Sequence, residues 1–184
     1  MDTQLLDRAI LFAVKAHAGT ARRGKGFPYI VHPMEAMAIA ATMTDGQEVL
    51  AAAALHDVVE DTDVTLDELR DMFGERVAQL VDTESDRRTP ALDWRARKEE
   101  SLRRLSLASR DEKIVAMGDK LSNMRAIARD YTTKGEVFWQ MFRIKEKAVH
   151  AWRYRALADA LSSLSDTYAY QEFKFLVDRI FPKK

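Results

Sequence analysis

The chain has 184 residues, of which 47% are hydrophobic and 32% charged, a composition typical of a soluble globular protein. Its 29 Lys and Arg residues balance its 29 Asp and Glu residues, so it lacks the basic excess of a general nucleic-acid binder. The absence of cysteine excludes disulfides and zinc–thiolate sites, and no apolar run reaches the roughly 18–20 residues that span a membrane. We therefore expect one soluble, cytoplasmic domain over residues 1–184 with no nucleic-acid or membrane partner, in an oligomeric state that the composition leaves open.

Apolar residues recur at helical spacing along the first third of the chain, and no segment alternates like a half-buried strand. Residues 5–18 predict a first helix, which a glycine- and cation-containing loop, GTARRGKGFPYI, follows. Pro33 suits the first turn of a second helix that ends before Asp45. Residues 47–59 predict the third helix.

The remainder of the chain is also predicted to be helical. The segment Thr65–Glu68 reads as a capping box, and Gly74 as the end of the helix that it starts. Further helices are expected over residues 75–86, 94–109, 112–129, 135–164 (long, with a bend) and 166–180. The predicted fold is therefore all-α, a single-domain irregular bundle of eight or nine helices.

The segment VLAAAALHDVVEDT combines a run of alanines with a histidine and three carboxylates, and it contains no cation. On a helix, His56 lies one turn from Glu60, and Asp57 lies one turn from Asp61 in the adjacent row. Negative charge is unfavourable at a helix C-terminus, so a divalent cation, distant arginines or solvent must compensate it. The alanine run favours a buried cluster and hence a cation, because buried acids without one are very costly.

Two other segments supply groups of the same kind. His32 in FPYIVHP precedes a helix, although a lone loop histidine is more often hydrogen-bonded for structure. Asp119 in KIVAMGDKLSNMRAIA lies among small and apolar residues, where a carboxylate needs a partner or a metal. Two histidines and two aspartates suit a divalent ion such as manganese or iron, with positions left for water and substrate.

These segments, RRGKGFPYIVHP, HDVVEDT and MGDKLSNMRAI, resemble the HD superfamily of metal-dependent phosphohydrolases. They are most similar to the (p)ppGpp hydrolase domain of RelA/SpoT-type enzymes, from about residue 5 to residue 130. That pattern has an arginine nine residues before the first histidine, then PYI-x-HP, HD-x-x-ED and D-x-x-x-N-M-R, in the order found here. The length and the helical C-terminal third resemble the small stand-alone alarmone hydrolases.

The resemblance implies roles for the residues at the matching positions. One Mn²⁺ would be held by His32, His56, Asp57 and Asp119. The attacking water would be handled by Glu60 and Asp61. The substrate, a nucleotide, would be bound by Arg23, Lys25, Asn123 and Arg125, with Arg23 packed on the base. The implied reaction releases pyrophosphate from the 3′ position of guanosine 3′,5′-polyphosphates, ppGpp or pppGpp.

The chain departs from the family pattern at positions that face the substrate. It reads D-K-L-S-N from Asp119 where the long enzymes usually read D-R-L-H-N, and Gly24–Lys25 replaces a lysine and a serine. The ligand positions are intact, so these changes bear on which nucleotide is used. Two alternatives therefore stay open: a phosphohydrolase of another nucleotide, such as NADPH or a deoxynucleotide, and a non-catalytic nucleotide-binding HD protein.

Other prominent side chains have less specific interpretations. Four of the five cations in the segment between residues 82 and 101 either meet the 5′ phosphates or form a solvated face: Arg87, Arg88, Arg95 and Lys98. The spacing of the two remaining histidines and of the aromatic residues near the C-terminus is typical of a packed core: His17, His150, Phe138, Trp139, Phe142, Trp152 and Tyr154. Tyr154 or Arg155 alternatively reaches the site from above.

Overall fold

The computed structural model describes residues 3–84 and 93–183, and within these ranges every regular element is a helix apart from an isolated bridge between Ala21 and Pro28. The elements are α1 (Gln4–Ala16), α2 (Val31–Ala40), α3 (Gln47–Leu55), α4 (Val58–Asp61), α5 (Leu66–Phe73), α6 (Glu75–Glu84), α7 (Trp94–Leu107), α8 (Arg110–Lys134), the 3₁₀ helix η1 (Gly135–Met141), α9 (Lys147–Ala160), the 3₁₀ helix η2 (Ser162–Leu164) and α10 (Tyr168–Ile180). The all-α prediction is confirmed.

Local side-chain chemistry starts and ends several of these helices. Thr65 and Glu68 form the predicted capping box at α5, and Gly74 ends that helix with a φ of 90°, which glycine adopts without strain. A second capping box, Ser109 with Glu112, starts α8, although the sequence pattern placed Ser109 at the end of the preceding helix. Thr167 caps α10 as predicted.

The alanine-rich helix α3 lies at the centre of the N-terminal part of the molecule. Its residues from Val49 to Leu55 are all buried, and it packs against α1, α2, α6 and α8. Small side chains let these four neighbours approach closely, so the helix that leads into His56 is fixed from several sides.

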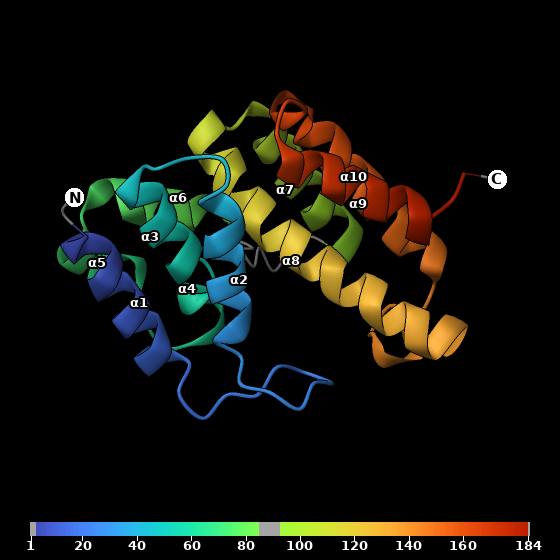
Figure 1. Ribbon diagram of the computed structural model, residues 1–184, viewed down its shortest axis with the longest axis horizontal. Coiled ribbons are helices and arrows are strands. Elements are labelled where there is room, and N and C mark those ends of the chain that lie inside the picture. Colours follow the sequence, from blue (N-terminus) through green and yellow to red (C-terminus); the bar gives the residue numbers. More distant parts are fainter. Residues whose placement is uncertain (1–2, 85–92, 184) are drawn as a thin grey trace.

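The long helix α8 runs through the molecule, with α1 to α6 on one side and α7, α9 and α10 on the other (Figure 1). Its contact with α2 is very close at Gly118, because a Cβ atom built there would lie 2.5 Å from the carbonyl oxygen of Ala36. Since α2 carries His32 and α8 carries Asp119, this contact sets the separation of two candidate ligands.

Two predicted helices are wrong in their extent. The helix expected over residues 47–59 ends at Leu55, and Asp57 separates it from the short α4. The imidazole of His56 donates from Nδ1 to the carbonyl oxygen of Ala53, the acceptor that a continuous helix would use for the amide of residue 57. The long helix expected over residues 135–164 is instead η1, an irregular stretch, α9 and η2.

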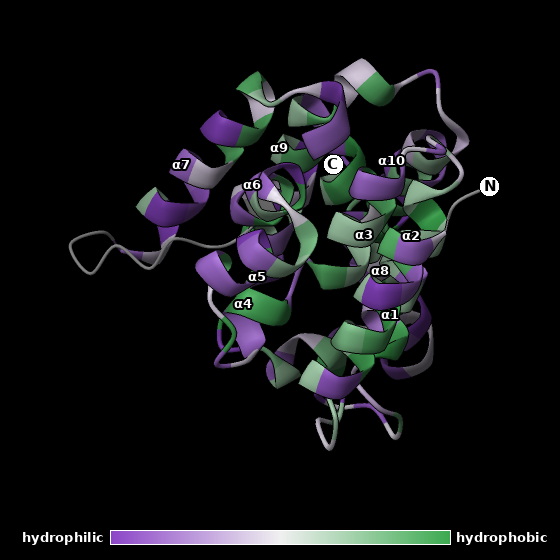
Figure 2. Ribbon diagram, turned by 90° about the vertical axis from the view of Figure 1, so that its left-hand side faces the viewer, coloured by the Kyte–Doolittle hydropathy of each residue, from purple (hydrophilic) through white to green (hydrophobic). Residues whose placement is uncertain are grey.

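Helix α7 lies at the edge of the molecule and is mostly hydrophilic, whereas the apolar stretches of the central helices lie inside (Figure 2). Among the described residues, no helix is both long and apolar enough to cross a lipid bilayer.

Candidate metal centre and active site

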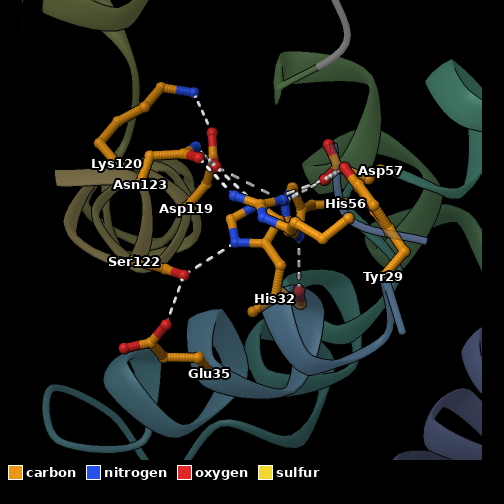
Figure 3. Close-up of polar contacts among 11 residues, drawn as sticks. Tyr29, His32, Glu35, His56, Asp57, Asp119, Lys120, Ser122 and Asn123 are labelled. Atoms are coloured by element: carbon orange, nitrogen blue, oxygen red, sulfur yellow. Dashed lines mark hydrogen bonds and ion pairs between the residues drawn. The ribbon is translucent and has the colours of Figure 1, made fainter. Parts of the chain in front are cut away.

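Three segments that are distant in the sequence bring two histidines and two aspartates together (Figure 3). His32 lies in the first turn of α2, His56 and Asp57 lie at the junction of α3 and α4, and Asp119 lies in the middle of α8. Both histidines and Asp119 are buried. The close packing of α2, α3 and α8 thus places these side chains.

The ring nitrogens and carboxylate oxygens of these residues meet at one point. Nε2 of His32 lies 3.1 Å from Oδ1 of Asp119 and 3.4 Å from Oδ2 of Asp57. Nε2 of His56 lies 3.0 Å from the same Asp57 oxygen and 3.7 Å from the Asp119 oxygen. The candidate ligand atoms of His32, His56 and Asp119 all lie within 4.8 Å of one another. The structure therefore brings together the four residues that the resemblance assigned to a metal.

The hydrogen bonds of the two imidazoles leave Nε2 of each ring as the atom with a free lone pair. Nδ1 of His56 lies 2.8 Å from the carbonyl oxygen of Ala53, which can only accept a proton. Nδ1 of His32 lies 2.8 Å from Oγ of Ser122, whose own proton is directed to Glu35. Each ring is therefore protonated at Nδ1 in its neutral form, and each Nε2 points at the carboxylates.

This donor set fits a divalent metal ion. Two Nε2 lone pairs facing carboxylate oxygens repel unless a cation lies between them, and Nε2 of His56 is buried without a hydrogen-bond partner. Ligand atoms at neighbouring positions around an ion are roughly 3 Å apart when bond lengths are about 2.1 Å, as octahedral geometry requires. Two of the observed separations, 3.0 and 3.1 Å, match that spacing, and the other two are 3.4 and 3.7 Å. Mixed imidazole and carboxylate donors suit manganese, iron or zinc.

The titration behaviour of the cluster also indicates stabilisation of positive charge at its centre. Burial alone would lower the pKa of His56, but the negative charges of Asp57 and Asp119 raise that pKa to about 9. Burial would raise the pKa of Asp119, but Lys120 and the two imidazoles hold it well below its usual range. The pKa of Asp57 is likewise held low, mainly by His56, against the effect of burial.

Several neighbours orient the two aspartates (Figure 3). The hydroxyl of Tyr29 donates to Oδ2 of Asp57 at 2.6 Å, and burial together with Asp57 raises the pKa of Tyr29, so it remains a donor. On α8, Lys120 donates to Oδ2 of Asp119 at 2.5 Å, and the amide of Asn123 donates to Oδ1. Tyr29 belongs to the PYI motif, although its role at the site was not predicted.

A cavity of about 220 Å³ opens directly onto this cluster. The predicted catalytic pair, Glu60 and Asp61, lies on its wall. The wall also carries four cations, from α7, α8, α9 and the loop between α1 and α2: Arg22, Lys98, Lys120 and Arg153. The sequence allowed two interpretations of Lys98, a contact with phosphate or a solvated surface position. Its position on the cavity wall favours the contact with phosphate. Arg153 was missed, because nothing near it in the sequence marks it as part of a site.

A second cavity, of about 760 Å³, continues from the first along α8. The two share Tyr29, Asp119, Asn123 and several cations. Beyond the shared part, the second cavity has aromatic walls, formed by Trp94, Phe138, Phe142 and Tyr154. The site therefore has one charged end with the candidate metal ligands and one larger, partly aromatic end.

The predicted substrate-binding residues have different surroundings. Arg23, Lys25 and Asn123 line the second cavity, where Lys25 forms an ion pair with Asp130. Oδ1 of Asn123 accepts a hydrogen bond from Arg22 at 2.6 Å. Arg125 is not among the residues that line either cavity. Its position therefore does not fit the predicted contact with substrate.

The remaining sequence interpretations divide between site and scaffold. Arg95 pairs with Glu99 and stacks on Trp152, which fits a surface role. His17 is buried with its ring against Tyr29, and burial lowers its pKa, in agreement with a structural role. Tyr154 faces the second cavity, as the alternative interpretation allowed. Arg87 and Arg88 lie outside the described residues.

Comparison with known proteins places these observations in a family. Residues 9–144 match the family model described as "HD domain". The chain is 39% identical over 130 residues to a guanosine-3′,5′-bis(diphosphate) 3′-pyrophosphohydrolase of Vibrio cholerae, an alignment that covers 67% of this chain and 18% of that protein. A protein of the same description from Aquifex aeolicus is 34% identical over 125 residues, 66% of this chain and 18% of the relative. The chain thus spans less than a fifth of the length of these relatives.

Two solved structures have the same fold. The structure of a metazoan ortholog of SpoT, described as hydrolysing ppGpp and playing a role in starvation responses, gives a TM-score of 0.76 at 23% identity and covers 98% of this chain and 96% of that one. A protein from Listeria monocytogenes EGD-e gives a TM-score of 0.75 at 26% identity, covering 83% of this chain and 99% of that one.

Proposed function

Because the chain belongs to the HD-domain family of metal-dependent phosphohydrolases, we propose that it releases pyrophosphate from the 3′ position of guanosine 3′,5′-polyphosphates, using one Mn²⁺. One observation supports this most directly. A buried pair of imidazoles and a pair of aspartates meet at the charged end of a cavity that also holds the carboxylates of Glu60 and Asp61.

The metal ligands in this proposal are His32, His56, Asp57 and Asp119. When bound, the ion would lower the pKa of a water molecule and polarise a phosphoryl oxygen. Tyr29 keeps Asp57 oriented through its hydrogen bond.

The two acids of α4 supply proton transfer. Glu60 and Asp61 line the cavity beside the ligand cluster, and neither belongs to the group of ligand atoms that converges there. One of them accepts the proton of the attacking water, and the pair orients that water toward phosphorus. A protein that only bound nucleotides would have no use for such a pair, which favours catalysis over a sensor role.

The cations of the first cavity suit a polyphosphate. Phosphoryl transfer depends mainly on positioning and on neutralising charge, and Arg22, Lys98, Lys120 and Arg153 converge from three helices and the loop between α1 and α2. The aromatic end of the second cavity suits a purine ring, and Arg23 presents a guanidinium that can stack on one. Two relatives described as acting on guanosine-3′,5′-bis(diphosphate) direct the choice of substrate within this class.

The decisive experiment is hydrolysis of ppGpp by the purified protein with Mn²⁺, measured as GDP and pyrophosphate formed. Asp57→Ala and Asp119→Ala should abolish both Mn²⁺ binding and turnover. Glu60→Gln should retain Mn²⁺ binding but lower kcat by about 10²- to 10⁴-fold if Glu60 is the base. Asp67→Ala serves as the matched control, because that carboxylate is exposed on α5 and should not affect either quantity.

The same assay distinguishes the alternatives. Wild-type rates in both Asp57→Ala and Asp119→Ala would show that the metal assignment is wrong. A higher kcat/KM for NADPH or a deoxynucleotide than for ppGpp would keep the chemistry and change the substrate. Tight binding of ppGpp without turnover in Mn²⁺, Fe²⁺, Mg²⁺ or Zn²⁺ would favour a non-catalytic nucleotide-binding protein.

A further inference from the structure

A continuous chain of hydrogen bonds leads from the candidate ligand His32 to the last helix of the molecule. Nδ1 of His32 lies 2.8 Å from Oγ of Ser122, and that oxygen lies 2.8 Å from Oε2 of Glu35 (Figure 3). The other oxygen of Glu35 accepts from Nη1 of Arg125 at 3.2 Å. Arg125 in turn forms a two-pronged contact with Glu172 of α10, at 2.7 and 2.6 Å.

The direction of this chain is set by Glu35. An ionised carboxylate can only accept hydrogen bonds, so the Ser122 hydroxyl must donate its proton to Glu35. The serine oxygen is then left to accept, and His32 must carry its proton on Nδ1. This tautomer leaves the lone pair on Nε2, which faces Asp57 and Asp119 at 3.4 and 3.1 Å. If these hydrogen bonds ran in the opposite direction, Nε2 of His32 would carry the proton and could not bind a metal.

Arg125 occupies the second oxygen of Glu35 and thereby orients this carboxylate. Its guanidinium joins two carboxylates that come from α2 and α10, and a guanidinium has no acceptor atom. Both Glu35 and Glu172 accept hydrogen bonds from Arg125, and Oε2 of Glu35 is left to accept from Ser122. Arg125 thereby acts away from the cavities, in agreement with its absence from their walls.

We propose that Ser122, Glu35, Arg125 and Glu172 form a positioning relay that fixes the His32 tautomer and makes metal affinity depend on α10. The inference rests on the metal site of the proposed function, but it does not depend on which nucleotide is hydrolysed. None of the four residues touches the reacting atoms, so they are positioning residues.

The test is the Mn²⁺ dissociation constant of the full chain, measured by isothermal titration calorimetry without nucleotide. Loss of a residue that orients a ligand typically weakens metal binding 10- to 100-fold, and we expect about that effect for Ser122→Ala and Glu35→Gln. Glu35→Gln is diagnostic because glutamine has the same side-chain shape as glutamate. Its NH₂ group can nevertheless donate to Ser122 and so reverse the direction of the hydrogen bonds. For Glu172→Gln, which acts at a distance, we expect a loss of about 2- to 30-fold.

Asp178→Asn is the matched control. Asp178 is also a carboxylate of α10 in an ion pair, with Lys174, but it has no contact with the relay. Its Mn²⁺ affinity should equal that of the wild type. Affinities within twofold of wild type for both Ser122→Ala and Glu35→Gln would overturn the relay. Equal losses in Glu172→Gln and Asp178→Asn would overturn its extension to α10, because general loosening of the helix would then explain both.

A spectroscopic readout separates the relay from plain destabilisation. In the protein loaded with diamagnetic Zn²⁺, the Nδ1 proton of His32 should give a downfield NMR signal that is protected from exchange with water. Ser122→Ala and Glu35→Gln should lose that signal, and Asp178→Asn should keep it. An unchanged signal in both relay variants would show that the tautomer is fixed by something else. This readout requires no substrate, so it stands even if ppGpp is not hydrolysed.

Discussion

At the scale of single residues, the site is a set of groups that are each unfavourable alone. Asp57 and Asp119 are carboxylates removed from most of the solvent, and His32 and His56 are buried imidazoles whose Nε2 atoms point at them. Burial of an ionised carboxylate without a cation costs several kcal/mol or more. The four side chains therefore form a stable arrangement only around positive charge, supplied either by protons or by a metal ion.

The competition between protons and metal predicts a pH dependence of binding. Without metal, the carboxylates hold the pKa of His56 at about 9, so the ring is protonated at neutral pH. That proton must leave before Nε2 can bind Mn²⁺, and the apparent affinity should therefore rise about tenfold per pH unit between pH 6 and 8. Titration calorimetry at pH 7 in two buffers of different ionisation enthalpy should show about one proton released per Mn²⁺ bound. Binding without proton release would contradict this.

The same pKa has a consequence for the metal-free fold. The folded-state pKa of His56 lies above the value of about 6.5 in the unfolded chain. The protonated ring therefore adds stability that is complete below pH 6.5 and is lost as the pH rises through 9. Saturating metal replaces the proton, so the protein with metal should not share this loss.

Site residues could be identified from the sequence where several polar side chains lie at helical spacing in one segment. They could not be identified where the interacting residues are far apart in the sequence. His56 and Asp57 were predicted to lie near Glu60 and Asp61 from helical spacing alone, and the structure places all four at one cavity. Glu35 was missed because its partner Ser122 is 87 positions away, and no local pattern connects them. Arg125 was assigned to substrate because it belongs to the D-x-x-x-N-M-R pattern, but two carboxylates from other helices bind it.

At the scale of secondary-structure elements, the contact between α2 and α8 controls the geometry of the site. Gly118→Ala should push these helices apart, since the new Cβ would lie 2.5 Å from the carbonyl oxygen of Ala36. We expect the free energy of unfolding in urea to fall by about 1–3 kcal/mol, as overpacked cores typically show. This loss should appear although alanine is otherwise favoured over glycine in a helix by about 1 kcal/mol. Mn²⁺ affinity should also fall, because Asp119 is the next residue.

Gly26→Ala is the comparison for that variant. A Cβ atom at Gly26 would have no neighbour within 4 Å, and its backbone does not require glycine. Stability and Mn²⁺ affinity should therefore stay at the wild-type values. A Gly118→Ala protein as stable as the wild type, with unchanged Mn²⁺ binding, would show that α2 and α8 adjust freely.

Helix ends that are capped by a polar side chain were easier to predict than helix ends that are determined by tertiary packing. The capping box at Thr65 and the cap at Thr167 are confirmed because these side chains bond to nearby backbone amides. The break after Met141 was not predicted, since the aromatic spacing of that region also suits a continuous helix. Tertiary contacts decide there: Trp139 packs its ring against His150 and Phe181, which come from later segments.

At the scale of the whole molecule, the candidate metal centre joins parts of the chain that are distant in the sequence. Its ligands come from α2, from the junction of α3 and α4, and from α8. The all-α class followed from the period of apolar residues, but which helices pack together did not. That arrangement depends on side-chain volumes, such as those of the alanines of α3 and of Gly118, whose meaning appears only when the neighbours are known.

A centre that ties these helices together should stabilise the entire fold when it binds metal. A ligand that binds only the folded state adds about 2.7 kcal/mol when its free concentration is 100 times its Kd. In a domain of this size, each kcal/mol of added stability raises the Tm by about 2–4 °C. Mn²⁺ should therefore raise the Tm by about 5–11 °C over its value in EDTA. Differential scanning calorimetry measures the shift. Asp119→Ala should remove it, whereas Asp67→Ala, an exposed acid of α5, should not. A wild-type Tm that is unchanged by Mn²⁺, Fe²⁺ and Zn²⁺ would mean that protons, and not a metal ion, neutralise the cluster.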